Sequence, residues 1–260
     1  MVLALGCPTV TAPVIPGAEP FTADGGPHGF LAIHGFTGNP SSMRPLAQRF
    51  AHAGWAVECP LLPGHGTALD DMLPTRWSDW SAAAEEAYQR LAERVEGRIV
   101  IGGLSMGGTL TVWLATRHAE VAGIVCINPV VASAGQLRDI VRAGVDMGQD
   151  TMAGISSDIA DPDSSELAYA ETPLRPLLSL FDAVEELQPS LASISVPILL
   201  VSSAQDHVVP PFNSDHLADA VSGPVERIVL ERSYHVATLD YDRDELEERA
   251  IDFATKVTAL

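Results

Sequence analysis

The sequence predicts an α/β protein in which helices cover both faces of a mostly parallel central sheet. Short apolar stretches alternate with stretches of helical periodicity along most of the 260 residues. This alternation is typical of parallel strands joined by crossover helices. A Gly-x-Ser-x-Gly turn between one apolar stretch and the next helical one indicates the same class, since such a turn lifts its serine above the edge of a sheet.

The expected elements follow one another from about residue 28 onward. Residues 1–27 are rich in Pro, Gly and Ala and are expected to form a leading arm or an extended edge segment. Strands are expected at 30–33, 55–59, from 99 to the Gly-x-Ser-x-Gly turn, and at 121–127, 197–202 and 225–230. Helices are expected at 42–52, 76–95, 109–118 and 246–257.

Residues 130–190 interrupt this alternation. They contain two helix-like stretches, 137–145 and 174–186, joined by an acidic, turn-rich stretch, and they carry no convincing strand. So long an interval between two sheet strands is typical of an insertion. We therefore expect a core domain of residues 1–129 and 191–260, with a helical cap of residues 130–190 over the active-site edge.

The composition limits the partners and the setting. A formal charge of −19 argues against nucleic acid and anionic membrane surfaces as partners. The three cysteines are widely spaced, which predicts neither a disulfide framework nor a zinc site and favours a reducing cytoplasm. No segment approaches the roughly 20 apolar residues that span a bilayer, so we expect no stable membrane insertion.

Ser105 is the candidate nucleophile. It lies at the centre of Gly103-Leu104-Ser105-Met106-Gly107, between the apolar run that begins at Ile99 and a helix. So tight a turn strains the backbone at the serine, and the flanking glycines make the crowding tolerable. The alternative is a structural turn serine.

His235 and Asp206 are the candidate base and acid. A serine hydroxyl needs a base, and this turn expects the order serine, acid, histidine. His235 follows the last strand and Asp206 follows the strand before it. The alternatives are a surface loop histidine and a turn-forming or helix-capping aspartate. His207 is expected to turn away from the site, while Asp240 is a weaker rival acid that a helix cap explains better.

Two backbone N–H groups are expected to form an oxyanion hole. One donor normally belongs to the residue after the nucleophile, here Met106, and the other to a loop after an early strand. Phe36, in His34-Gly35-Phe36-Thr37-Gly38, fits that second position, and its ring can line the pocket. His34 is expected to fix this loop by hydrogen bonding, and the loop 61–67 is expected to be structural.

Apolar residues of the 130–190 interval are candidates for the wall of an acyl pocket. Packing of the cap helices on the main domain is the alternative for each of them. The candidates are Met152, Leu174, Leu177, Leu178 and Phe181.

Five motifs in this order resemble the bacterial carboxylesterases and monoacylglycerol lipases of the α/β-hydrolase superfamily. They are His34–Gly38, Gly64–Gly66, Gly103–Gly108, Asp206–Val209 and Ser233–His235. The resemblance runs from about residue 29 to the last helix and is weakest in residues 130–190. It implies a triad of Ser105, Asp206 and His235, oxyanion donors at Phe36 and Met106, a small helical lid and no cofactor or metal.

The expected function is that of a serine carboxylic-ester hydrolase. The resemblance implies short- to medium-chain acyl esters as its small-molecule substrates, with monoacylglycerols among them, and an acyl-enzyme intermediate. Other reactions on the same fold stay open, namely those of a thioesterase, an amidase or peptidase, a carbon–carbon hydrolase or a perhydrolase. A non-catalytic ligand receptor is the alternative from a different class. A cytoplasmic monomer or homodimer is expected.

Overall fold

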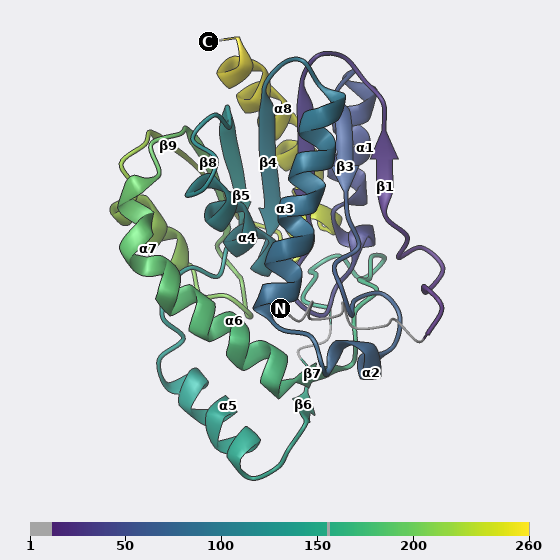
Figure 1. Cartoon of the computed structure of the whole chain (residues 1–260), viewed down its shortest axis with the longest axis vertical. Helices are drawn as coiled ribbons and strands as arrows, with labels where there is room; N and C mark the ends of the chain where they lie inside the picture. Colours follow the sequence, from purple (N-terminus) through teal and green to yellow (C-terminus); the bar gives the residue numbers. More distant parts are fainter. Residues whose placement is uncertain (1–11, 155–156, 260) are drawn as a thin grey trace, which may run out of the picture.

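A seven-stranded sheet organises the chain. The computed structural model describes residues 12–154 and 157–259, so the first eleven residues of the expected arm lie outside it. The strand order is β1-β3-β2-β4-β5-β8-β9, and every pairing is parallel except that of β1 with β3 (Figure 1). The strands are β1 (Phe21–Ala23), β2 (Gly29–Ile33), β3 (Ala56–Cys59), β4 (Ile99–Leu104), β5 (Gly123–Ile127), β8 (Ile198–Ser203) and β9 (Val225–Leu230).

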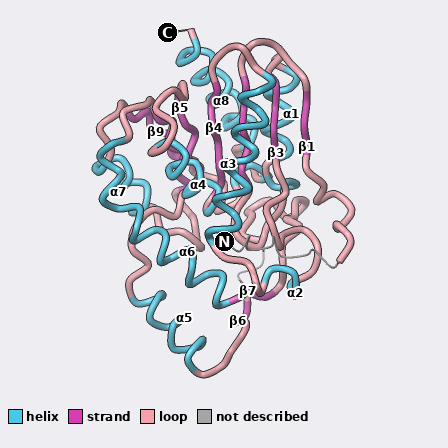
Figure 2. Tube along the Cα trace, in the orientation of Figure 1, coloured by secondary structure: helices cyan, strands magenta, loops and turns pink. Residues whose placement is uncertain are grey.

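Helices cover both faces of this sheet, as the sequence predicts (Figure 2). Strand residues alternate between two cores, with Leu31 and Ile33 of β2 on one side and Phe30 and Ala32 on the other. Helices α3, α4, α6 and α7 pack on the first side and α1 and α8 on the second. They span α1 (Arg44–His52), α3 (Trp77–Arg94), α4 (Met106–Ala115), α6 (Leu174–Leu187), α7 (Phe212–Ala220) and α8 (Arg243–Thr258).

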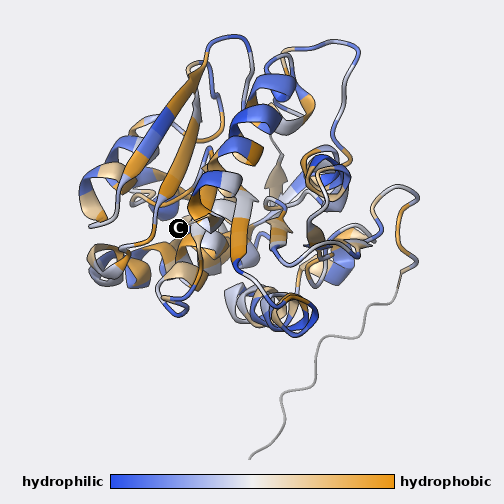
Figure 3. Cartoon of the chain, turned by 90° about the horizontal axis from the view of Figure 1, so that it is seen from above, coloured by the Kyte–Doolittle hydropathy of each residue, from blue (hydrophilic) through white to orange (hydrophobic). Residues whose placement is uncertain are grey.

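Both cores are continuous and apolar. Figure 3 shows hydrophobic residues gathered in the strands, with hydrophilic residues on the outer helices and loops. Cys59 and Cys126 are buried as free thiols, one in each core. No helix in the described part of the chain is long and apolar enough to cross a membrane.

Residues 130–190, called the insert below, add no strand to the main sheet in the part that the structure describes. They lie between β5 and β8, and α5 (Gln136–Asp146) extends beyond the lower edge of the sheet in Figure 1. The expectation that this interval carries no strand is wrong. Strands β6 (Thr151–Ala153) and β7 (Glu171–Pro173) form an antiparallel pair of three residues each, too short to leave an alternating pattern in the sequence.

Short elements complete the chain. Helices α2 (Leu69–Met72) and α7 were not expected from periodicity, since α2 has one turn and α7 buries a single large apolar side chain, Leu217. Three 3-10 helices are η1 (Pro40–Ser42), η2 (Gln188–Ser193) and η3 (Ala237–Leu239) within the described ranges.

The turn from β4 into α4 brings the helix unusually close to the sheet. Ser105 adopts φ 58° and ψ −117°, a left-handed conformation that non-glycine residues rarely take. A Cβ on Gly103 would lie 2.1 Å from the carbonyl oxygen of Gly107, and one on Gly107 would lie 2.1 Å from that of Ile33. Only glycine allows this contact between α4, β4 and β2.

Replacing Gly107 by alanine should therefore destabilise the fold. The added methyl would meet backbone atoms that cannot rotate away, and overpacking of this kind costs about 1–3 kcal/mol. Chemical denaturation of Gly107→Ala measures the loss. Ala92→Ser adds one heavy atom on the exposed face of α3 and serves as the control, expected within about 0.5 kcal/mol of the wild type. Equal stability of the two variants would contradict the close approach.

Candidate active site

Ser105 lies where β4 ends and α4 begins, at the carboxyl edge of the sheet. Its backbone N–H donates to the carbonyl of Ile127 at 2.9 Å, and its carbonyl accepts from Thr109 at 3.2 Å. Its side-chain hydroxyl has no hydrogen-bond partner among the described residues, and the residue is 8% exposed. The hydroxyl thus faces the pocket without an internal acceptor.

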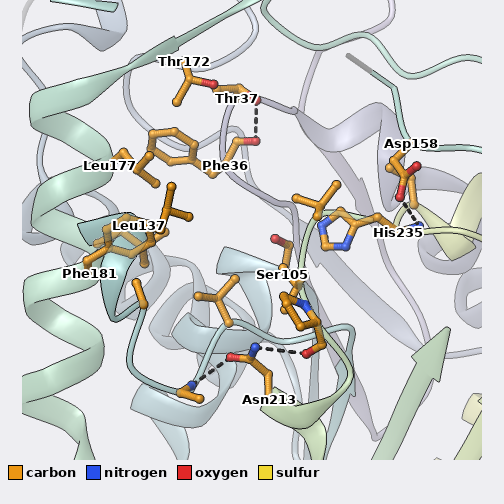
Figure 4. Close-up of a pocket in the computed structure, with 18 of the residues that line it drawn as sticks. Phe36, Thr37, Ser105, Leu137, Asp158, Thr172, Leu177, Phe181, Asn213 and His235 are labelled. Carbon is orange, nitrogen blue, oxygen red and sulfur yellow. Dashed lines mark hydrogen bonds between the residues drawn. The ribbon is translucent and has the colours of Figure 1, made fainter. Parts of the chain in front are cut away.

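Asp206 and His235 meet at the same edge although 29 residues separate them. Nδ1 of His235 lies 2.7 Å from Oδ2 of Asp206. The other oxygen of Asp206 accepts from the backbone N–H groups of Val208 and Val209 at 2.8 and 2.7 Å. Because both of its carboxylate oxygens are engaged, the Asp206 side chain is fixed. Its contact with Nδ1 leaves the other ring nitrogen of His235, Nε2, for the pocket that Ser105 also lines (Figure 4).

The two expected oxyanion donors lie beside Ser105. Met106 begins α4, where a backbone N–H has no acceptor within the helix. The N–H of Phe36 has no acceptor among the described residues. Its loop passes Ser105 closely, since a Cβ on Gly35 would lie 3.4 Å from the Cβ of Ser105. Two backbone donors that lack an acceptor among the described residues, near one hydroxyl, suit an oxyanion hole.

Two buried histidines hold the loops around these donors. His34 Nδ1 lies 2.9 Å from the carbonyl of Gly35, and its Nε2 accepts from Leu62 N–H at 3.1 Å. The expectation that His34 fixes its loop by hydrogen bonding is therefore confirmed. Burial lowers the pKa of His34 well below its usual value and lowers that of His65 to about 4. Both rings are neutral at pH 7.

Ser105 and His235 open into a cavity of about 380 Å³, a volume that suits a small organic ligand. Apolar side chains line one side of Ser105, whereas His235 and Asp158 lie on the other (Figure 4). The apolar lining includes Phe36, Val130, Leu137, Leu177, Leu180 and Phe181, called the apolar wall below.

The wall differs in part from the sequence expectation. Of the residues that the sequence suggests for the pocket, Phe36, Leu177 and Phe181 line the cavity. Met152 does not, because it lies exposed on β6. Leu174 and Leu178 do not either, because they are buried against Val141 of α5, in a cluster to which Leu177 and Phe181 also belong.

Acidic residues of the insert and of the last loop have contacts that the sequence did not reveal. Asp240 neither contacts His235, whose partner is Asp206, nor caps α8, whose N-cap residue is Asp242. It accepts instead from the backbone N–H groups of Ala160, Asp161, Tyr234 and Tyr241. His207 turns away from Ser105 and Asp206, as expected, and its Nδ1 lies 2.9 Å from Asp158.

Glu166, like Asp158, lines the pocket although the sequence does not single it out. Its carboxylate lies close to the Phe36 loop, since a Cβ on Gly38 would come within 2.8 Å of it, and it lines the cavity. It has no hydrogen-bond partner among the described residues. Burial raises the pKa of Glu166, and the nearby His235 opposes that rise. An unpaired carboxylate in an apolar site is a cost to folding that points to a ligand contact.

The raised pKa of Glu166 sets a pH dependence of stability. A carboxyl group whose pKa is higher in the folded than in the unfolded chain does not change the free energy of unfolding while it is protonated in both states. It lowers that free energy as pH rises from the unfolded-state pKa through the folded-state pKa. Glu166→Gln should therefore melt at a higher temperature than the wild type at pH 8, with a smaller difference at pH 5. Glu171→Gln removes the same charge from an exposed site and should show no such trend. A Glu166→Gln variant less stable than the wild type at pH 8 would contradict the assignment.

Comparison with known proteins places the chain in a family. Residues 28–242 match the family described as serine aminopeptidase, S33. The chain is 46% identical to the thermostable monoacylglycerol lipase of Bacillus sp. (strain H-257), over 94% of this chain and 97% of that protein. It is 26% identical to the carboxylesterase of Bacillus subtilis (strain 168), over 92% and 97%.

Solved structures agree. One described under LipS and LipT, two metagenome-derived lipolytic enzymes, has a TM-score of 0.90 at 39% identity and covers 94% of this chain and 100% of its own. The monoacylglycerol lipase of Paleococcus ferrophilus shares the fold, with a TM-score of 0.75 at 18% identity over 92% and 99% of the two chains. These comparisons confirm the expected α/β-hydrolase fold and agree with the expected class of serine ester hydrolase. The chain belongs to the serine aminopeptidase S33 family of α/β hydrolases.

Proposed function

We propose that this protein hydrolyses monoacylglycerols with short- to medium-length acyl chains through an acyl-enzyme on Ser105. One observation carries the proposal: an imidazole held by a fixed carboxylate shares an apolar cavity with a serine on a strained turn. The 46% identity to a protein named as a monoacylglycerol lipase supports the substrate class.

The reaction follows from the roles of three side chains. Nε2 of His235 accepts the Ser105 proton while Oγ forms a bond to the ester carbonyl carbon. The carbonyl oxygen takes up the negative charge, which the N–H groups of Phe36 and Met106 stabilise. The bond to the alcohol then breaks, and the imidazolium, stabilised by Asp206, gives its proton to the departing oxygen. A water deprotonated by the same imidazole releases the acid and restores Ser105.

The two sides of the cavity suit the two halves of such an ester. The apolar wall that includes Leu177 and Phe181 offers contact for an alkyl chain. Glu166 lies near His235, on the side where the leaving alcohol must receive its proton. A carboxylate without a donor among the described residues is suited to accept hydrogen bonds from the free hydroxyls of a glycerol group. We therefore propose the insert as the cap that selects both halves.

Other readings of this site remain distinguishable. Esters, thioesters and anilides with the same acyl group separate an esterase from a thioesterase or a peptidase, and turnover separates any of them from a receptor. The absence of a cofactor, the cytoplasmic setting and the monomer or homodimer state stay predictions.

Removal of the Ser105 hydroxyl should abolish turnover. Ser105→Ala is expected to lower kcat for p-nitrophenyl butyrate by about 10³-fold or more, because triad members act as a unit. It should also lose covalent labelling by a fluorophosphonate. Ser202→Ala is the control, since that buried hydroxyl in β8 has no hydrogen-bond partner within the described residues. Wild-type turnover by Ser105→Ala would contradict the proposed mechanism.

Loss of the Glu166 charge should affect the glycerol ester more than a simple ester. For Glu166→Gln we expect the ratio of kcat/KM for 1-monodecanoylglycerol to that for ethyl decanoate to fall about 10-fold, since hydrogen bonds to charged groups contribute about 1.5–3 kcal/mol. Parallel assays of the two esters measure the ratio. Glu171→Gln again supplies the matched charge change. An unchanged ratio would remove Glu166 from substrate recognition.

A further inference from the structure

Asp158 connects the insert to both loops that carry the acid and the base. It belongs to the segment between β6 and β7, and its side chain is 11% exposed. Oδ2 accepts from the backbone N–H groups of His235 and His207, each at 3.1 Å. Oδ1 lies 2.9 Å from Nδ1 of His207. One carboxylate thus bonds to the base's own backbone and to the residue next to the acid.

The backbone of Asp158 adds a further bond to the histidine loop. Its carbonyl accepts from Val236 N–H at 3.1 Å. The neighbouring residues Ala160 and Asp161 donate to Asp240, which also accepts from Tyr234 N–H. Residues 158–161 are therefore bonded to the chain on both sides of His235.

The opposite side of the histidine loop is held by the sheet. Asn128, directly after β5, donates from Nδ2 to the carbonyl of His235 at 2.8 Å. Ser203, the last residue of β8, donates to the carbonyl of Tyr234 at 2.7 Å. The sheet thus fixes the carbonyls of the loop, and Asp158 fixes the N–H of His235. Without the Asp158 carboxylate, the backbone N–H of His235 loses its hydrogen-bond acceptor in the insert.

We infer that Asp158 is a positioning residue that holds His235 in register with Asp206 and Ser105. The inference rests on the proposed function, because it assigns the residue's effect to the triad. Asp158 takes no part in proton transfer. Its carboxylate fixes where the main chain of the base lies relative to the acid loop, and a shift of about 1 Å in a catalytic group can cost about 10²-fold in rate.

Variants of Asp158 that differ in the number of side-chain oxygens able to accept a hydrogen bond test this role. Asp158→Ala removes all three bonds, and Asp158→Leu does so while keeping a side chain of similar shape. Both are expected to lower kcat for p-nitrophenyl butyrate about 10- to 100-fold with KM within about threefold of the wild type. Asp158→Asn keeps one oxygen that can accept both backbone N–H groups, so it should restore most of kcat. The control is Asp163→Ala, an exposed carboxylate of the same segment, which should match the wild type.

A second measurement reports on the triad itself. The proton between His235 Nδ1 and Asp206 should give a low-field NMR resonance in the wild type and in Asp163→Ala, and it should shift or broaden in Asp158→Ala or Asp158→Leu. A folded Ala or Leu variant with wild-type kcat and resonance would overturn the inference, as would an Asn variant as impaired as the Ala variant. Active Ser105→Ala would instead overturn the proposed function, so the two failures are distinguishable.

Discussion

The close approach of α4 to β2 and β4 is the constraint on which the site depends. It leaves a single residue, Ser105, to reverse the chain, and so forces a left-handed backbone there. Thr37 and Asn128, the other non-glycine residues with positive φ in the described ranges, lie after β2 and β5 at the same edge. Strained residues thus gather on three neighbouring strands of one sheet. Such strain persists only where the surrounding packing holds the backbone in place. Here two apolar cores pack against the strands, one on each face of the sheet.

Acidic side chains at this edge are stabilised mainly by backbone N–H groups. Asp206, Asp158 and Asp240 each accept at least two such bonds, whereas no Lys or Arg within the described residues pairs with any of the three. Backbone donors are fixed by the fold, so they hold a carboxylate more rigidly than a long cationic side chain does. The Glu166 carboxylate accepts no such bond from the described residues, and burial raises its pKa.

The sequence predicts the parts of the site that local geometry determines. The turn at Ser105 is encoded by adjacent glycines, and Asp206 and His235 follow strands whose carboxyl ends must share an edge. Other parts depend on contacts between distant segments. Asp158 is 49 residues from His207 and 77 from His235, and no spacing rule links these positions. The helical periodicity of α6 likewise places Leu174, Leu177, Leu178 and Phe181 on one apolar face, and only the packing against α5 shows that Leu177 and Phe181 reach the cavity whereas Leu174 and Leu178 do not.

The insert contributes to the site in two ways. Its helices supply the apolar wall, while residues 158–161 hold the loop of His235. Wall residues such as Leu177 and Phe181 contact the cavity but make no bond to the triad, so their size can vary without displacing the imidazole. Asp158 has no such freedom, because any movement that shifts its carboxylate also shifts the backbone of the base. Changes of substrate preference in this fold should therefore be accommodated on α5 and α6, with the segment that touches His235 kept in place.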